Sequence, residues 1–138
     1  MPLYLGDTSA WNRSKQRPEI EGRWAVLIAE GGLAITPPVS LELLLSAQGP
    51  ADFAQFQDEL QALPLLPLDE PAVERATRVQ ELLVLRGQHG GPKPMDLLIA
   101  AVAELHDAVL IHYDRHFDAV RRATGQPMEW LARRGSLE

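Results

Sequence analysis

The amino-acid sequence predicts an α/β fold in which a parallel sheet of four to five strands is covered by helices on both faces. Short apolar runs, typical of buried strands, alternate along the chain with longer segments of helical periodicity. Parallel strands need crossover connections, which are usually helices, and strands buried on both faces are apolar throughout. Together these features predict a three-layer α/β/α sandwich with a central parallel sheet.

The first part of the chain is expected to form a strand, a helix, a second strand and a second helix. Helix-capping residues follow the first strand, a glycine pair ends the first helix, and a proline pair suits the first turn of the second helix. The four elements are predicted at residues 3–6, 19–30, 33–36 and 39–47.

The rest of the chain continues the alternation. Phe53, Phe56 and Leu60 recur at helical spacing, a short third strand is expected at 65–68, and a long amphipathic helix follows. A loop rich in glycine and proline comes next, at 87–94. The long helix before this loop is predicted at 71–86. After the loop come a helix, a fourth strand, a short helix and an edge strand, at 94–106, 109–111, 115–122 and 128–130.

Length and composition favour one intracellular domain. With 138 residues and 46% hydrophobic content, the chain can bury one core, so residues 1–138 are expected to form a single domain. No long uncharged apolar run or signal-peptide pattern is visible, which favours a cytoplasmic protein. The absence of cysteine excludes thiolate metal sites and cysteine nucleophiles.

The charge distribution leaves two interpretations open. A net charge of −6 argues against simple phosphate binding, unless bound divalent cations offset some of the acidic residues. Basic residues nevertheless cluster near both ends of the chain, where they either contact nucleic acid or form solvated faces. The clusters are Arg13, Lys15, Arg17 and Arg23, and Arg115, Arg121, Arg122, Arg133 and Arg134.

Four acidic residues are candidates for one site. Asp7 and Asp114 follow the first and fourth strands, and ligands of such sheets bind at the carboxyl ends of the strands. Asp96 opens a very apolar helix, and Glu42 interrupts a run of leucines. Each could separately cap a helix or face solvent. Together they predict a carboxylate cluster suited to Mg²⁺ or Mn²⁺ and hence to phosphodiester hydrolysis.

Four segments of the chain also resemble PIN-domain ribonucleases, and the length and layout are similar to the VapC toxins of bacterial toxin–antitoxin pairs. The resemblance implies that Asp7, Glu42, Asp96 and Asp114 are the catalytic residues and hold Mg²⁺, with Mn²⁺ as a possible substitute. It also implies an RNA substrate, a small antitoxin partner and a homodimer. The segments are residues 5–11, 38–43, 95–101 and 110–118.

The resemblance assigns further roles around this quartet. Thr8 is expected to orient Asp7 or the water network of the site. The family often has Thr or Ser in place of His112 and a further Asp in place of His116, so the ligand set of the fourth segment stays open. A strand is expected to end between the two histidines, which favours satisfied or exposed side chains over zinc ligands. Asp118 is expected to serve at the start of a helix. Trp24 and Trp130 are expected in the core, which leaves Trp11 as the tryptophan near substrate.

Two other functions remain possible. A phosphoryl-accepting signalling domain has a similar sheet, but that family needs a lysine at a strand end, and neither Lys15 nor Lys93 is placed there. A PIN-like protein that binds RNA without cutting it would not need the intact quartet. Metal-dependent cleavage would separate this second possibility from a nuclease.

Overall fold

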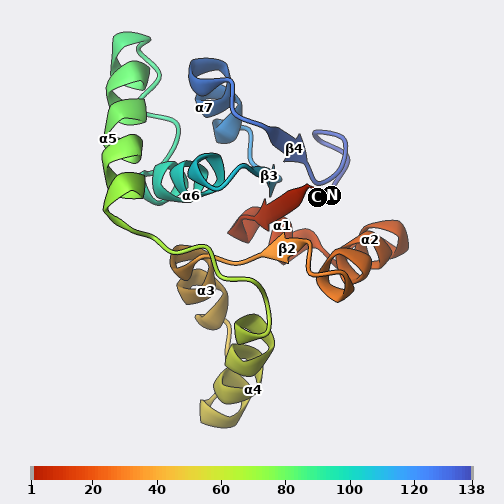
Figure 1. Ribbon diagram of the computed structural model, residues 1–138. Helices are drawn as coiled ribbons and strands as arrows, with labels where there is room; N and C mark the ends of the chain where they lie inside the picture. Colours follow the sequence, from red (N-terminus) through yellow and green to blue (C-terminus); the bar gives the residue numbers. More distant parts are fainter. Residues whose placement is uncertain (1, 138) are drawn as a thin grey trace.

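The computed structural model describes residues 2–137 and has the predicted α/β fold, with helices on both faces of a parallel sheet (Figure 1). Its elements are β1 (Leu3–Gly6), α1 (Thr8–Arg13), α2 (Pro18–Ala29), β2 (Leu33–Ala34), α3 (Pro37–Leu44), α4 (Pro50–Gln61), α5 (Glu70–Leu85), α6 (Pro94–Leu105), β3 (Ala108–His112), α7 (His116–Thr124) and β4 (Met128–Trp130).

The sheet has the strand order β2-β1-β3-β4, and each neighbouring pair is parallel. β1 and β3 lie side by side in the middle, where Leu3 pairs with Ala108 and Gly6 with Ile111. The register continues past the strand, because the Asp7 N–H donates to the Ile111 carbonyl at 3.0 Å. The segments that follow β1 and β3 therefore lie at the same edge of the sheet.

The third strand predicted at 65–68 is wrong. Leu65 forms an isolated parallel bridge with Ile35, flanked by hydrogen bonds from Ile35 N–H to Pro64 and from Leu66 N–H to Ile35. Pro67 has no N–H to extend this pairing into a ladder. β2 is also shorter than predicted, because the chain leaves the ladder and begins α3 directly after Thr36.

Two hydrophobic clusters cover the two faces of the sheet. Leu5 and Leu110 belong to the larger cluster, which also contains buried residues of α3 to α7, whereas Leu33 and Ile111 belong to a smaller one with α1 and α2. The alternation along β3 follows from the two-residue period of a strand. Figure 1 shows α5, α6 and α7 on one side of the sheet and α2 on the other.

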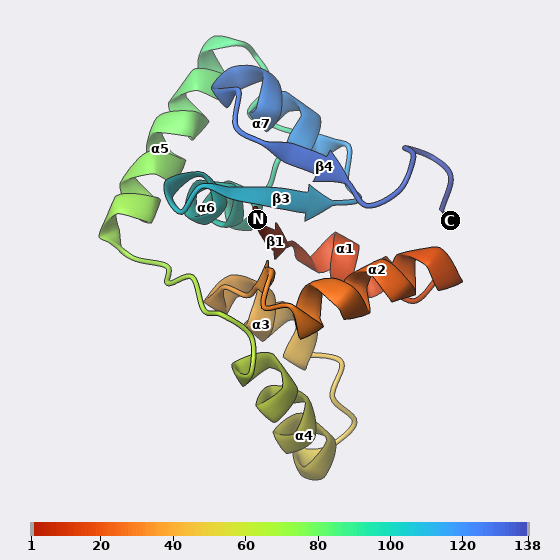
Figure 2. The ribbon, with the colours of Figure 1, turned by 45° about the vertical axis from the view of Figure 1, so that its right-hand side comes forward.

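The α3–α4 pair extends away from the sheet, as Figure 2 shows. α3 begins at the carboxyl end of β2, so this extension carries Glu42 at the edge of the sheet where Asp7 lies. Across residues 2–137, none of the helices combines the length and the apolar character needed to cross a bilayer.

Candidate active site

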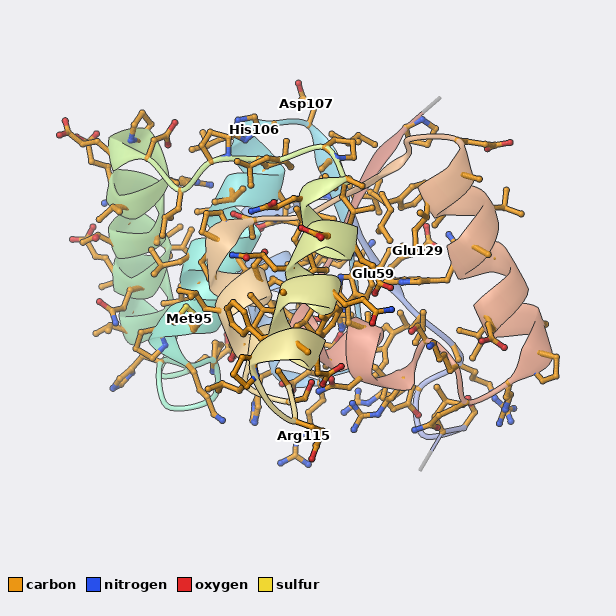
Figure 3. The ribbon with its side chains drawn as sticks, turned by 90° about the horizontal axis from the view of Figure 1, so that it is seen from below. Glu59, Met95, His106, Asp107, Arg115 and Glu129 are labelled. Atoms are coloured by element: carbon orange, nitrogen blue, oxygen red, sulfur yellow. The ribbon has the colours of Figure 1, made fainter. Side chains whose placement is uncertain are left out.

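The four predicted carboxylates line one open cleft at the carboxyl edge of the sheet. This carboxylate cleft has a volume of about 600 Å³, and Asp7, Glu42, Asp96 and Asp114 all contribute to its wall. They come from four places in the fold: the segments just after β1 and β3, the last turn of α3 and the first turn of α6. Figure 3 shows Asp107, just before β3, and Arg115, just after Asp114, at opposite ends of the molecule.

Asp7 is the most buried of the four. It is the N-cap of α1, and its Oδ1 accepts hydrogen bonds from the Ser9 hydroxyl at 2.7 Å and from the Ala10 N–H at 3.2 Å. Burial raises the pKa of Asp7 to about 7, the hydrogen bonds oppose that rise, and the charge of Asp96 adds to it. Hydrogen bonds within the protein therefore do not compensate the negative charge at this position.

Asp96 is close enough to the other carboxylates to respond to their charge. Its Oδ2 accepts the Lys93 N–H at 2.9 Å, a contact that fastens the first turn of α6. Burial is the largest cause that raises the pKa of Asp96, and the negative charges of Asp114 and Glu42 raise it further. A cation in the cleft would relieve the repulsion that these pKa shifts reflect.

The donor set of the cleft fits a hard divalent cation. All four side chains offer carboxylate oxygens, the ligands that Mg²⁺ and Mn²⁺ prefer. Within residues 2–137, no three Asp, Glu or His side chains already surround a single ion position. An open arrangement is compatible with Mg²⁺, which binds proteins through one or two carboxylates and keeps several water ligands.

Ser9 was missed as a site residue. Its hydroxyl donates to Asp7 and accepts the Tyr113 N–H at 2.8 Å, so it links the carboxylate after β1 to the backbone after β3. The Thr8 hydroxyl donates to Glu42 and not to Asp7, so the first of the two roles expected of Thr8 is wrong and its role in the water network stays a prediction. The sequence marked Ser9 only as a helix-capping residue, a role that says nothing about partners on distant segments.

Asp114 and the two histidines form a local turn. Asp114 Oδ1 accepts the His116 N–H at 2.9 Å, and the Asp114 N–H lies 3.2 Å from His112 Nδ1, which accepts it. Burial lowers the pKa of His112 to about 4, so this ring is neutral at pH 7. It packs against Phe117 and Trp130. His112 is therefore structural, as expected, and Asp118 is engaged with Trp130 and Arg134.

Basic side chains share the wall of the carboxylate cleft. Arg13, Lys93, Arg115 and Arg134 line it together with the four acids. The net negative charge of the chain therefore does not describe the local field, because cations stand where a phosphate would enter. Trp130 lines this cleft, whereas Trp11 lines a separate groove, so the placement of Trp11 near substrate stays a prediction.

Comparison with known proteins shows which family the chain resembles. A PIN-domain model matches residues 4–123. The chain is 41% identical to ribonuclease VapC18 of Mycobacterium tuberculosis over 98% of this chain and 99% of the relative, and 36% identical to ribonuclease VapC51 of the same species over 98% and 97%. Its fold is similar to the crystal structure of DNA-bound VapBC from Salmonella typhimurium, with a TM-score of 0.73, 18% identity, and 96% and 100% of the two chains covered.

Proposed function

The chain belongs to the PIN-domain family, and from this premise we propose that it is a Mg²⁺-dependent endoribonuclease, the toxin of a toxin–antitoxin pair, and acts in the cytoplasm. The observation that carries the proposal is the meeting of Asp7, Glu42, Asp96 and Asp114 in one cleft with a basic rim. The curated relatives are themselves named VapC ribonucleases. Metal-assisted RNA cleavage uses both parts of this arrangement: the carboxylates would hold the ion, and the basic rim would hold the negatively charged phosphate.

Asp7, Glu42, Asp96 and Asp114 would hold the ion, with Mn²⁺ as an alternative to Mg²⁺. When bound, the ion would lower the pKa of a water ligand and offset charge on the phosphate. The protein holds the ligands in place: Ser9 fixes Asp7, Thr8 fixes Glu42, and the Lys93 N–H fixes Asp96. Arg13, Lys93, Arg115 and Arg134 would orient the phosphodiester by charge and hydrogen bonding.

Removal of divalent metal tests the proposal directly. Purified protein incubated with cellular RNA in Mg²⁺ is expected to produce discrete fragments, EDTA should abolish them, and excess Mg²⁺ or Mn²⁺ should restore them. Gel analysis of end-labelled RNA measures the outcome. Undiminished cleavage in EDTA would contradict the metal assignment, and RNA binding without cleavage in any metal would favour the non-catalytic alternative.

The antitoxin partner is proposed to dock on an apolar groove beside the cleft. Solved structures similar in fold include VapBC toxin–antitoxin proteins. In this chain, α1 to α4 enclose an apolar groove of about 520 Å³, and Figure 3 shows Glu59, one of its residues, on α4. Its apolar lining is Trp11, Trp24, Ile28, Leu43, Phe56, Leu60 and Leu63. An amphipathic segment of the antitoxin would fill this groove and place a basic side chain near the carboxylates.

A charged residue in the groove should disrupt that complex. Ile28→Asp is expected to weaken antitoxin binding at least tenfold, because docking would bury an unpaired carboxylate. Ile28 is 40% exposed, so the folded monomer should tolerate the change. Val26→Asp is the matched control, since Val26 lies on the same helix, is 53% exposed and stands outside the groove lining. Calorimetry with the cognate antitoxin, sought among the products of short reading frames next to the gene, measures both variants.

Growth provides the second readout of this prediction. Expression of the parent chain alone should arrest the host, and co-expression of the partner should restore growth for the parent and for Val26→Asp but not for Ile28→Asp. Harmless expression of an active parent chain without a partner would contradict the toxin assignment. Equal binding of both variants would remove the groove from the interface.

A further inference from the structure

A second pocket adjoins the carboxylate cleft. It has a volume of about 360 Å³, and Arg115 and Arg134 line both it and the cleft. One wall is the loop of residues 87–92, and the other is the face of α7 that carries His116, Ala119 and Arg122 at helical spacing. We refer to it as the arginine pocket. Because Arg115 and Arg134 line both depressions, the pocket and the cleft lie next to each other.

The lining of this pocket carries a net positive charge, and ion pairs neutralise only part of it. Within the described residues, neither Arg115 nor Arg122 takes part in an ion pair. The acidic residue of the lining, Asp118, already accepts hydrogen bonds from Trp130 Nε1 at 3.2 Å and from Arg134 at 3.1 Å. Arg134 also lies over the Trp130 ring, 5.6 Å from its centroid, which holds it at the boundary between pocket and cleft.

The shape of the pocket depends on glycine in the loop. A Cβ at Gly91 would stand 3.0 Å from His116 Nδ1, so a larger residue would have to displace the His116 ring. Glycine therefore lets the loop approach α7 closely and form an opposing wall. The rest of the loop adds small or uncharged lining residues, Gly87, Gln88, Gly90 and Pro92, which do not compete with the arginines for an anion.

We propose that the arginine pocket binds a phosphodiester group of the RNA strand next to the one positioned in the carboxylate cleft, with Arg122 as its main ligand. The proposal rests on the proposed nuclease function and adds a subsite to it. Guanidinium groups bind phosphate oxygens in a bidentate manner, and contacts along the backbone set the register of a strand without reading bases. Arg115 and Arg134 would stand between the two neighbouring phosphates.

The adjacent residue Arg121 provides a matched control. Both arginines are exposed and lie in the last turn of α7, but Arg121 stands outside the linings of the pocket and the cleft. Arg122→Ala and Arg121→Ala remove the same charge and have the same effect on the helix. A difference between them therefore reports the pocket rather than the net charge of the protein.

Salt-dependent binding of single-stranded RNA tests the proposal. We expect Arg122→Ala to weaken binding of a fluorescein-labelled twelve-nucleotide RNA several-fold at low salt and to reduce the slope of log affinity against log salt by about 0.7, the value for one lost phosphate contact. Arg121→Ala should leave both quantities close to those of the parent. An Asp96→Asn background in Mg²⁺ prevents cleavage during the titration. With Asp96 intact, Arg122→Ala should raise the KM for RNA cleavage, whereas Arg121→Ala should leave the KM close to that of the parent.

Three outcomes would decide against the subsite or against the function beneath it. Equal weakening by both variants would assign the effect to overall charge and overturn the subsite. Parent-like binding by Arg122→Ala would overturn it as well. If the parent chain cleaves RNA in either case, the proposed function stands without the subsite, whereas a parent chain that neither binds nor cleaves RNA would overturn both.

Discussion

Asp96→Asn is expected to lower RNA cleavage by orders of magnitude while it preserves the fold. The substitution removes one charge from the carboxylate cleft, and metal-assisted hydrolysis depends on that charge to hold the ion. The asparagine side chain keeps an oxygen that can accept the Lys93 N–H, so the first turn of α6 retains its contact. Loss of cleavage would therefore report the missing charge, measured as kcat on a labelled RNA.

Thermal melts distinguish a metal ligand from a helix cap. Without metal, the Asp96→Asn protein should be at least as stable as the parent, because the repulsion from Asp114 and Glu42 has been removed. With excess Mg²⁺, the parent should gain more stability than the variant. If Asp96 served only the helix dipole, the loss would be roughly 0.3 to 1 kcal/mol with or without metal.

Asp69→Asn is the control for this experiment. Asp69 is the N-cap of α5, where its Oδ1 accepts the Ala72 N–H at 3.2 Å, and it lies outside the cleft lining. The control should change neither cleavage nor the response to Mg²⁺. An active Asp96→Asn protein whose melting temperature falls equally in EDTA and in Mg²⁺ would remove Asp96 from the site.

Asp7 is expected to lower the stability of the metal-free protein as the pH rises from about 4 to about 7, while His112, whose folded-state pKa is about 4, contributes in the opposite sense. The folded-state pKa of Asp7, about 7, lies above the ordinary aspartate value of 3.8, so the folded protein favours the protonated side chain. Its contribution to stability is fully present below pH 4 and is lost as the pH rises through 7. The loss has an upper limit of roughly 4 kcal/mol, since each pKa unit corresponds to about 1.4 kcal/mol.

Asp7→Asn should remove this contribution of Asp7. The stability of the variant relative to the parent, measured with urea in EDTA as the difference in free energy of unfolding, should therefore rise between pH 4 and pH 8, because the contribution of His112 is present in both proteins and cancels in the difference. Asp58→Asn, a substitution of an exposed carboxylate on α4, should retain the parental slope. Mg²⁺ should shift the pH dependence of the parent toward that of the variant, because a bound cation favours the charged carboxylate. A variant with the full parental slope would show that Asp7 is not the group responsible.

The sequence by itself determined the layered fold and which four carboxylates share an edge. Apolar strand runs, helical spacing and the glycine and proline positions are local signals, and the rule that parallel strands end at one edge joins Asp7 to Asp114. The signal failed at 65–68, where apolar residues mimic a strand but Pro67 cannot extend the ladder beyond a bridge.

Only the tertiary structure decided how the site is held and what surrounds it. Ser9 reaches Tyr113 across 104 residues of sequence, and Thr8 reaches Glu42 across 34. Neither contact leaves a local pattern in the chain. Trp130 rather than Trp11 lines the cleft, and Arg122 rather than Arg121 lines the arginine pocket. Both placements likewise depend on how whole elements pack. Periodicity assigns residues to the faces of an element, whereas side-chain partners depend on the packing of segments that are distant in the sequence.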